Sequence, residues 1–472
     1  MAAAVSNNTC DPFSVRELPC DAGNAVTYSV NASEPSHFAQ AIAFAGSKNI
    51  RLVIRNTGHD FLGKSTGKWA LSVWTHHMKG TERLHYNSTF YTGPAIKLNA
   101  GVQVEEAYEA THAHNSVVVG GDCATVGVVG GYLQGGGHSP LSSVYGMGAD
   151  QVLEWEVVDG TGRLLRASPL ENADLYWALS GGGGGTFGIV SSVVVKTYPD
   201  MRTSGVQLAF NLDTERPGAF YNAVNRYHEL VPEFTAAGGM AIALITNSSF
   251  LLTPLTLPNM SQADAEALVA PLARELDDQG LHYNLNVTEY PNWLSFWQQL
   301  IKPNPTQLVQ NAQFGGWMVP RSVVEENPRG LQAAIQDITK SGCDFVGLAL
   351  NASMPEGSSD NSILPSWRSA AMCVILSTSW PQGADARRMR EMSDTMTQTC
   401  VPALAKLAPE AGAYLNEADP NQPGWQAAFY GDNYDRLLAI KNEYDPEHVF
   451  YAQTAVGSES HWIDNDGRLC RS

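Results

Sequence analysis

The residues with the most evident chemistry lie in a glycine-rich stretch, residues 120–148, which also contains Cys123. Glycine loses much backbone entropy on folding, so this density predicts positive φ angles or a main chain lying close against a ligand. The N–H groups of such a segment suit a large anionic ligand. We therefore expect the stretch to wrap a dinucleotide cofactor that Cys123 touches or bonds. The alternative for Cys123 is a buried structural thiol.

A second candidate, His59, directly follows Gly58 in a turn after the apolar run 50–55. The alternative for His59 is a turn histidine that is hydrogen-bonded to its neighbours. Four further histidines lack the spacing and the partners of a zinc or iron site, so no metal is predicted; they are His76, His77, His112 and His114.

Another glycine cluster, residues 180–188, is not a Walker loop because no Gly-Lys-Ser/Thr follows it. Its expected role is backbone contact with a pyrophosphate or a ribityl chain.

Composition excludes several classes of protein. A chain of 472 residues is too long for one compact core, so two domains are expected. The 29 basic and 47 acidic residues give a net charge of −18, which argues against nucleic acid and anionic membranes as partners. No apolar run approaches the roughly 18 residues that span a bilayer.

Cysteines and glycosylation sequons predict a secreted protein. Seven cysteines allow three disulfides and leave one thiol over, with Cys10 and Cys20 placed to close a small loop. Residues 1–5 are too short for a signal peptide, so we expect that an expression start has replaced one. The alternative is a reduced cytosolic protein. The Asn-x-Ser/Thr sequons begin at Asn7, Asn31, Asn87, Asn247, Asn259, Asn286 and Asn351.

The elements that must position these residues can be read from apolar patterns. A strand is expected at 25–30, then a helix capped by Ser33 or Ser36, then a strand at 50–55 that ends at the His59 turn.

After the glycine stretch, residues 152–158 and 164–166 predict a hairpin, Ser168 the N-cap of a helix with Pro169 at its first position, and residues 189–195 a strand. Residues 205–400 alternate strands with helices, which predicts an antiparallel sheet backed by helices in a separate domain.

Four segments, in this order and spacing, resemble the berberine bridge enzyme-like branch of the vanillyl-alcohol oxidase flavoproteins. The Gly-His-Ser-Pro-Leu sequence at 137–141 resembles the fungal subgroup. The segments are residues 55–60, residues 121–127 with 135–137, residues 180–190, and Tyr444-Asp445-Pro446 with 448–450. The last is expected to be a structural turn that docks the C-terminal segment.

The resemblance implies an α+β, two-domain vanillyl-alcohol oxidase-like fold. Residues 1–203 and 405–472 would form the FAD-binding domain, and 204–404 an antiparallel-sheet substrate domain. It implies bicovalent FAD, with His59 on the 8α-methyl and Cys123 on ring carbon 6. The other implied cofactor-binding residues are Arg55, Asn56, Thr57, Gly58, Asp60, Gly121, Thr125, Val126, Gly127, Gly130, Gly131, Gly136, Gly137, His138, Gly185, Gly188 and Val190.

The Tyr-x-Asn pattern of the family matches Tyr414-Leu415-Asn416. Tyr414 is the candidate base, and Asn416 would position substrate or cofactor. Because phenol titrates near pH 10, Tyr414 needs a carboxylate relay or a nearby positive charge. Glu417, Asp419 or an acidic residue of the substrate domain are open candidates. The alternative for Tyr414 is a core tyrosine with a satisfied hydroxyl.

The expected function is that of a secreted, monomeric, N-glycosylated FAD oxidase, which transfers hydride from an alcohol carbon to flavin N5 and electrons to O2, giving H2O2. Sugars or oligosaccharides are the first substrate class, and an alkaloid or polyketide oxidase or cyclase of secondary metabolism is the alternative. A third possible function is that of a binding or cyclising protein that keeps flavin only as a scaffold. Candidate stacking platforms for sugars, with core packing as the alternative, are Trp293, Trp297, Trp317 and Trp367.

Overall fold

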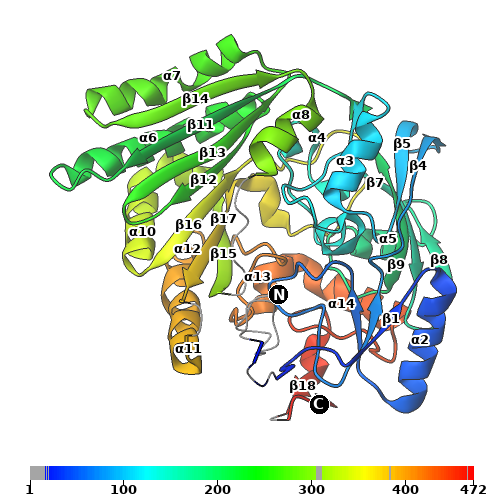
Figure 1. The fold of residues 1–472 in the computed structure, drawn as a ribbon. Coiled ribbons are helices and arrows are strands. Elements are labelled where there is room, and N and C mark those ends of the chain that lie inside the picture. Colours follow the sequence, from blue (N-terminus) through cyan, green and yellow to red (C-terminus); the bar gives the residue numbers. More distant parts are fainter. Residues whose placement is uncertain (1–15, 18, 20, 304–310, 382–383, 465) are drawn as a thin grey trace.

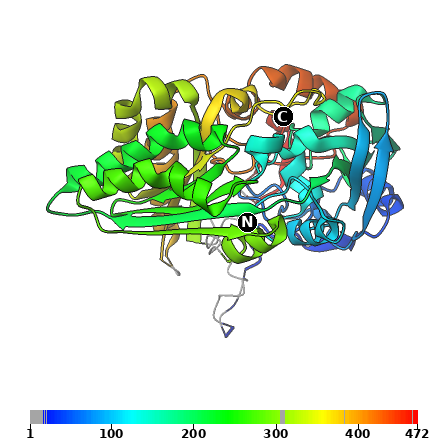
Figure 2. The same cartoon turned by 90° about the horizontal axis from the view of Figure 1, so that it is seen from above.

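The computed structural model describes residues 16–472 except 18, 20, 304–310, 382, 383 and 465. Two lobes lie side by side, and the chain passes from one to the other and back (Figures 1 and 2). The predicted two-domain α+β class is confirmed. The domain boundaries at 203 and 404 stay a prediction, although the strands divide near the first of them.

The first lobe begins with a small parallel sheet and one helix. The strands β1 (Tyr28–Asn31), β3 (Leu71–Trp74) and β2 (Leu52–Arg55) pair in this order. The helix α2 (Pro35–Lys48) buries Phe38 and Ile42. The predicted serine caps are wrong, because Glu34 is the N-cap residue and Pro35 starts the helix without a side-chain cap. Strand β2 ends at Arg55, and the turn that contains His59 follows directly.

A five-stranded antiparallel sheet forms the body of this lobe, in the order β4-β5-β9-β7-β8. The predicted hairpin and the strand after the second glycine cluster are confirmed. The helix predicted from Ser168 is wrong: its Oγ accepts from the N–H groups of residues 170 and 171 and closes a turn, and the helix starts later. The bounds are β4 (Thr81–Asn87), β5 (Thr92–Asn99), β7 (Val152–Val158), β8 (Leu164–Ala167), α5 (Ala173–Leu179) and β9 (Ile189–Lys196).

The glycine-rich stretch has little regular structure. It runs from β6 to β7 as short turns and helical pieces. The elements around and within it are α3 (Val104–His112), β6 (Ser116–Val117), η1 (Val128–Tyr132), α4 (Ser142–Tyr145), η2 (Gly148–Gln151) and β10 (Tyr198–Pro199).

The second lobe is built on one seven-stranded antiparallel sheet, here called the central sheet. Its order is β14-β11-β13-β12-β16-β17-β15, and the prediction for residues 205–400 is confirmed. The bounds are β11 (Thr203–Asn211), β12 (Met240–Ile245), β13 (Ser249–Pro258), β14 (Tyr283–Tyr290), β15 (Ala312–Pro320), β16 (Cys343–Ala349) and β17 (Ala370–Ser379).

Helices cover one face of the central sheet, and Figure 2 shows them stacked above its strands. The opposite face therefore remains to meet the first lobe. The helices of this lobe are α6 (Pro217–Ala236), α7 (Gln262–Asp278), α9 (Arg321–Glu326), α10 (Pro328–Lys340), η5 (Pro365–Ser369), α11 (Ala386–Thr395), η6 (Met396–Cys400) and α12 (Val401–Ala405). Two further pieces, α8 (Trp293–Phe296) and η3 (Trp297–Ile301), lie on the cavity side, where Ile301 reaches the lining.

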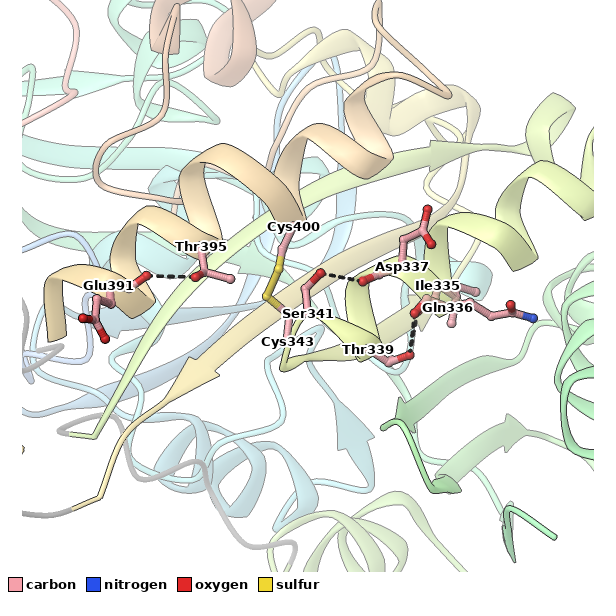
Figure 3. Close-up of a disulfide and its surroundings, with 9 residues drawn as sticks. All are labelled: Ile335, Gln336, Asp337, Thr339, Ser341, Cys343, Glu391, Thr395 and Cys400. Atoms are coloured by element: carbon pink, nitrogen blue, oxygen red, sulfur yellow. Dashed lines mark hydrogen bonds between the residues drawn. A yellow bond between two sulfur atoms is a disulfide. The ribbon is translucent and has the colours of Figure 1, made fainter. Parts of the chain in front are cut away.

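One disulfide ties the covering helices to the central sheet. Cys343, at the start of β16, bonds Cys400, at the end of η6 (Figure 3). The expectation of three disulfides and one thiol is wrong, because Cys123, Cys373 and Cys470 are all free in the described part of the chain. The odd cysteine count therefore does not single out Cys123. The predicted Cys10–Cys20 loop lies outside the described residues.

The C-terminal segment returns to the first lobe, where the red and blue ends meet in Figure 1. The Asp445 carboxylate accepts from the N–H groups of Val449 (2.8 Å) and Phe450 (3.0 Å), and Phe450 bridges to Leu52 of β2. The 444–446 turn thus has the predicted structural role. The elements are α13 (Trp425–Tyr430), η7 (Gly431–Asn433), α14 (Tyr434–Tyr444), η8 (Ser458–Ser460), β18 (His461–Ile463) and β19 (Leu469–Arg471). None of the described helices combines the length and apolarity needed to cross a bilayer.

Candidate active site

A cavity of about 720 Å³ lies where the two lobes meet. Segments 54–65, 121–138, 184–190 and 414–417 contribute most of its lining, and side chains of the central sheet close it from the other lobe. Four stretches far apart in sequence, each containing a predicted motif, therefore converge on one space.

The two predicted flavin anchors meet at one hydroxyl. His59 Nε2 lies 2.7 Å from Thr125 Oγ1, and Cys123 Sγ lies 3.8 Å from the same oxygen. Partial burial lowers the pKa of His59, so its ring is neutral at physiological pH. A neutral imidazole and a thiol thus project into the cavity side by side.

The turn after His59 is held by its own carboxylate. Asp60 accepts from the backbone N–H of Lys64 (2.6 Å) and of Ser65 (3.2 Å), and from the Ser65 hydroxyl. The same turn places Phe61 in a stack on Phe314 of β15, with ring centroids 4.4 Å apart. His59 is therefore positioned by a closed loop that also contacts the central sheet.

Two asparagines bring glycine backbones close together beneath the cavity. Asn56 donates to the carbonyl of Ala100 (2.5 Å), and its Oδ1 occupies the space that a Cβ on Gly127 would need. Asn416 donates to the carbonyl of Gly131 (2.7 Å). Glycine is required at Gly127 because a side chain there would overlap Asn56, as the density of glycines in this stretch predicts.

Several buried polar atoms of the lining have no hydrogen-bond partner among the described residues. They are Asn56 Oδ1, Asp122 Oδ1, Tyr132 OH, Gln134 Oε1 and His138 Nδ1. Buried polar groups are normally paired, so such a set marks the site of a ligand with donors and acceptors of its own. A flavin carries both kinds of group around its ring and ribityl chain, and the lining fits it.

Acidic and basic groups gather at one end of the lining. His138 Nε2 lies 3.1 Å and 3.3 Å from the two Glu417 oxygens. Burial alone would lower the pKa of His138, but the Glu417 carboxylate raises it overall. Burial, with a further contribution from Glu417, raises the pKa of Asp122 to about 6. A histidine paired with a glutamate is therefore flanked by Asp122, a carboxyl group whose pKa is raised to about 6.

Tyr414 borders this group and holds its proton strongly. Its hydroxyl accepts from Asn416 Nδ2 (2.7 Å), while burial and the Glu417 charge raise its pKa well above 10. The expected pKa-lowering relay is absent from the described surroundings of Tyr414. Glu417 binds His138 instead, and Asp419 is buried elsewhere with Gln313 and Thr397. The base role of Tyr414 stays a prediction.

The predicted site residues mostly converge on the cavity. Three of them lie outside the lining: Arg55, which packs against Gly58, and Gly136 and Gly137, whose positive φ angles shape a turn. In the lining are Asn56, Thr57, Gly58, His59, Asp60, Gly121, Cys123, Thr125, Val126, Gly127, Gly130, Gly131, His138, Gly185, Gly188, Val190, Tyr414 and Asn416.

Sequence reasoning missed Asp122, Tyr132, Gln134 and Lys64 as lining residues. Burial lowers the pKa of Lys64 to about 8 despite nearby Asp60. Asp122 could have been predicted from its position directly before Cys123, because both residues line the cavity.

The predicted tryptophan platforms are wrong. All four indoles are buried in packed regions, Trp317 being the most exposed at 7%, and none lines the cavity. Trp297 Nε1 donates to the carbonyl of Asp122 (3.1 Å), and Trp317 Nε1 to that of Ala408 (2.8 Å). Paired N–H groups allow these two rings to serve as core, whereas Trp293 Nε1 is buried without a partner among the described residues.

Comparison with known proteins agrees with this geometry. Residues 27–168 match the family model of an FAD binding domain, and residues 413–457 the model described as berberine and berberine like. The chain is 55% identical over 472 residues to the FAD-linked oxidoreductase patO of Aspergillus clavatus, which covers all of this chain and 82% of that protein.

It is 40% identical over 479 residues to the bifunctional decalin synthase calF of Penicillium decumbens, covering 100% of this chain and 83% of that protein. Among solved structures, the VAO-type flavoprotein MtVAO615 of Myceliophthora thermophila C1 superposes with a TM-score of 0.92 at 38% identity. The superposition covers 98% of this chain and 85% of that one.

Proposed function

Because the chain belongs to the berberine bridge enzyme-like branch of the VAO-type, FAD-linked oxidoreductases, we propose that it is an oxidase of alcohol CH–OH groups with doubly tethered FAD. The observation that carries the proposal is the approach of His59 and Cys123 to one hydroxyl, Thr125. When bound, the flavin accepts a hydride from the donor carbon and passes the electron pair to dioxygen, giving hydrogen peroxide.

The residues of the chain divide the remaining work. His59 and Cys123 hold the cofactor from the wall where their side chains meet. Asn416 supports the floor through Gly131 and positions the Tyr414 hydroxyl. The proton of the donor hydroxyl is taken at the end of the cavity where Glu417, His138 and Tyr414 gather.

A second candidate function is an oxidase or cyclase of secondary metabolism. The relative calF is described as a bifunctional decalin synthase, which supports ring-forming chemistry on this scaffold. Flavin reduction by an alcohol that yields peroxide separates the first candidate from a cyclisation without net oxidation.

Secretion with N-glycosylation remains part of the proposal. Five sequon asparagines are exposed, which supports it: Asn31, Asn87, Asn247, Asn259 and Asn286. Asn351 is partly buried, and Asn7 lies outside the described residues. A monomeric state is proposed as well, and size-exclusion chromatography with light scattering tests it.

Acid precipitation tests the tethers directly. We expect yellow colour to stay with the pellet of the wild-type protein and of His59→Ala or Cys123→Ser, and to leave the pellet of the double variant. Matched controls are His77→Ala and Cys470→Ser, an exposed histidine and a free thiol away from the cavity. Colour that leaves the wild-type pellet, or a flavin that no donor reduces, contradicts the proposal.

A further inference from the structure

The main chain around Cys123, residues 121–126, is here called the cysteine loop. Its later part is bound to the start of α3 in the first lobe. The carbonyls of Ala124 and Val126 accept from the backbone N–H groups of Glu105 (3.1 Å) and Val104 (3.0 Å). The segment that follows the cysteine is therefore held by the lobe to which it belongs.

The carbonyl directly before the cysteine is held by the other lobe. Trp297, the first residue of η3, donates from its indole Nε1 to the carbonyl of Asp122 (3.1 Å). The ring is 0% exposed, so packing fixes the direction of its N–H. A side chain of the second lobe thus sets the position of the peptide group that leads into Cys123.

Aromatic packing and an ion pair keep η3 against α3, and α8 lies beside α3 in Figure 1. Tyr108 of α3 meets the rings of Trp293 and Trp297 edge-on, with centroids 5.7 Å and 5.2 Å apart. Lys302, which follows η3, forms an ion pair with Glu105, and its ammonium lies 5.9 Å from the centroid of the Trp297 ring. The cysteine loop is therefore held between α3 and η3.

We infer that Trp297 is a positioning residue for the thiol tether, because its hold on the Asp122 carbonyl aims the Cys123 sulfur at ring carbon 6 of the flavin. The inference rests on the proposed function, since it concerns one of the two tethers proposed there. His59 lies on a different loop, which Asp60 closes through backbone N–H groups. Docking of the second lobe is thus a condition for the bond at Cys123 and not for the bond at His59.

Formation of the thiol tether depends on geometry. The thiol and ring carbon 6 each lose one hydrogen, a sulfur–carbon bond replaces the S–H and C–H bonds, and dioxygen takes the two protons and two electrons as hydrogen peroxide. The sulfur must therefore be held in line with one carbon atom. A misplacement of about 1 Å can slow such a step about 100-fold.

Variants in which only one tether can form test the inference on the flavin-loaded protein. In His59→Ala, Cys123 alone holds the flavin, and the acid pellet should be yellow. Adding Trp297→Phe keeps an aromatic ring but removes the N–H, and the flavin in the pellet should fall at least about tenfold. Mass spectrometry of the peptide that contains residue 123 should give the same ratio. Cys123→Ser with Trp297→Phe should stay as yellow as Cys123→Ser alone.

Trp317→Phe is the matched control. Trp317 is also buried and also donates from Nε1 to a carbonyl, that of Ala408 (2.8 Å), which lies outside the cysteine loop. We expect Trp317→Phe to lower the melting temperature about as much as Trp297→Phe, yet to leave the pellet of His59→Ala yellow. If Trp297 had only a structural role, the two variants would behave alike.

Lys302→Met gives a second test if Trp297→Phe does not fold. It removes only the ion pair between η3 and α3, whose side chains are 41% and 28% exposed. Such a pair contributes little, so we expect about twofold less flavin at Cys123 in the His59→Ala background. Arg387→Met opens an exposed ion pair on α11 and should leave the flavin content unchanged.

Undiminished flavin at Cys123 in folded Trp297→Phe, or in Lys302→Met where that variant is the one available, overturns the inference and leaves the proposed function standing. Loss of flavin from Cys123→Ser with Trp297→Phe also overturns it, because the indole would then support the whole site. If His59→Ala alone gives a colourless pellet, Cys123 carries no flavin, and both the double tether and the inference are wrong.

Discussion

The two walls of the cavity are made in different ways. On the flavin side, loops that follow strands carry glycines, buried polar atoms without partners and the two predicted anchors, and the shape of these loops depends on which backbone segments are in contact. On the central side, the pleat of an antiparallel sheet presents aliphatic side chains in register. The flavin side is therefore specified by close backbone contacts at glycines, whereas the central side is specified by the side chains that its strands present.

The walls also differ in what supports them. Beneath the flavin side, Lys441 and Asp445 form a buried ion pair (2.5 Å), and the same ammonium donates to the carbonyls of Thr186 (2.7 Å) and Phe450 (2.8 Å). It thus joins the second glycine cluster to the C-terminal segment. The central side is supported by the Cys343–Cys400 disulfide. Variants that remove the ion pair or the disulfide weaken each support separately.

Removing the buried cation should have the largest effect. Lys441→Met leaves the Asp445 carboxylate buried without its charge partner, and we expect a loss of about 3–5 kcal/mol in the free energy of unfolding, measured by urea denaturation. The exposed pair Arg387–Glu391 has the same i,i+4 spacing, so Arg387→Met is the control and should cost less than about 0.5 kcal/mol. Equal losses of unfolding free energy in the two variants would contradict the expectation that the buried ion pair matters more than the exposed one.

Opening the disulfide should weaken the central lobe without releasing flavin. The bond closes a loop with a sequence separation of 57, so Cys343→Ser with Cys400→Ser should cost about 4 kcal/mol. Differential scanning calorimetry measures the loss, and the flavin-to-protein ratio should stay unchanged. A coupled loss of flavin would show that the two walls are less independent than the structure indicates.

Filling the space at Gly127 should disturb the flavin side. In Gly127→Ala the new Cβ overlaps Asn56 Oδ1, and we expect a loss of about 1–3 kcal/mol with lower flavin loading. Asn56→Ala in the same chain removes the overlapping oxygen and should recover most of the stability. As a control, Gly46→Ala in α2 meets no atom and should stabilise by about 0.5–1 kcal/mol. If the double variant is no more stable than Gly127→Ala alone, the overlap with Asn56 is not the cause of the loss.

The titration of Asp122 should give the smallest effect. Its pKa is raised from 3.8 to about 6, so the folded state holds the proton more tightly than the unfolded chain and loses stability as pH rises from about 4 to about 6. Asp122→Asn should therefore stabilise by about 1–3 kcal/mol at pH 8 and by almost nothing at pH 3. Urea midpoints at both pH values test this, with the exposed Asp337→Asn as control. A gain at pH 3 as large as at pH 8 would exclude the titration as the cause.

The sequence foretold the fold class and most strands because apolar runs such as 189–195 and 240–245 have strand length and end at turn residues. His59, Cys123 and the glycines of the lining could be placed in one region because they belong to local motifs, and the bonds from His59 and Cys123 to flavin stay a prediction. The Ser168 cap failed because a serine hydroxyl binds the N–H groups of a turn as readily as those of a helix start.

The rest depended on contacts between distant residues. His138 and Glu417 are 279 positions apart, and no local pattern pairs them. The free state of Cys373 follows from its place inside the central sheet, which cysteine counting does not show. The burial of Trp297 depends on a distant partner as well, because its indole N–H donates to the carbonyl of Asp122, 175 positions away.

The cavity is closed by residues from both ends of the chain, with the central sheet inserted between them. A ribosome releases the Tyr414 segment roughly 290 residues after Cys123, which at about 5–20 residues per second is on the order of half a minute. During this interval residues 54–138 have been synthesised, but Asn416 and the Lys441–Asp445 ion pair that support the cavity have not. We therefore expect that the chain must be finished before it can bind flavin, and that a truncation ending before Tyr414 yields a colourless product even though His59 and Cys123 are present.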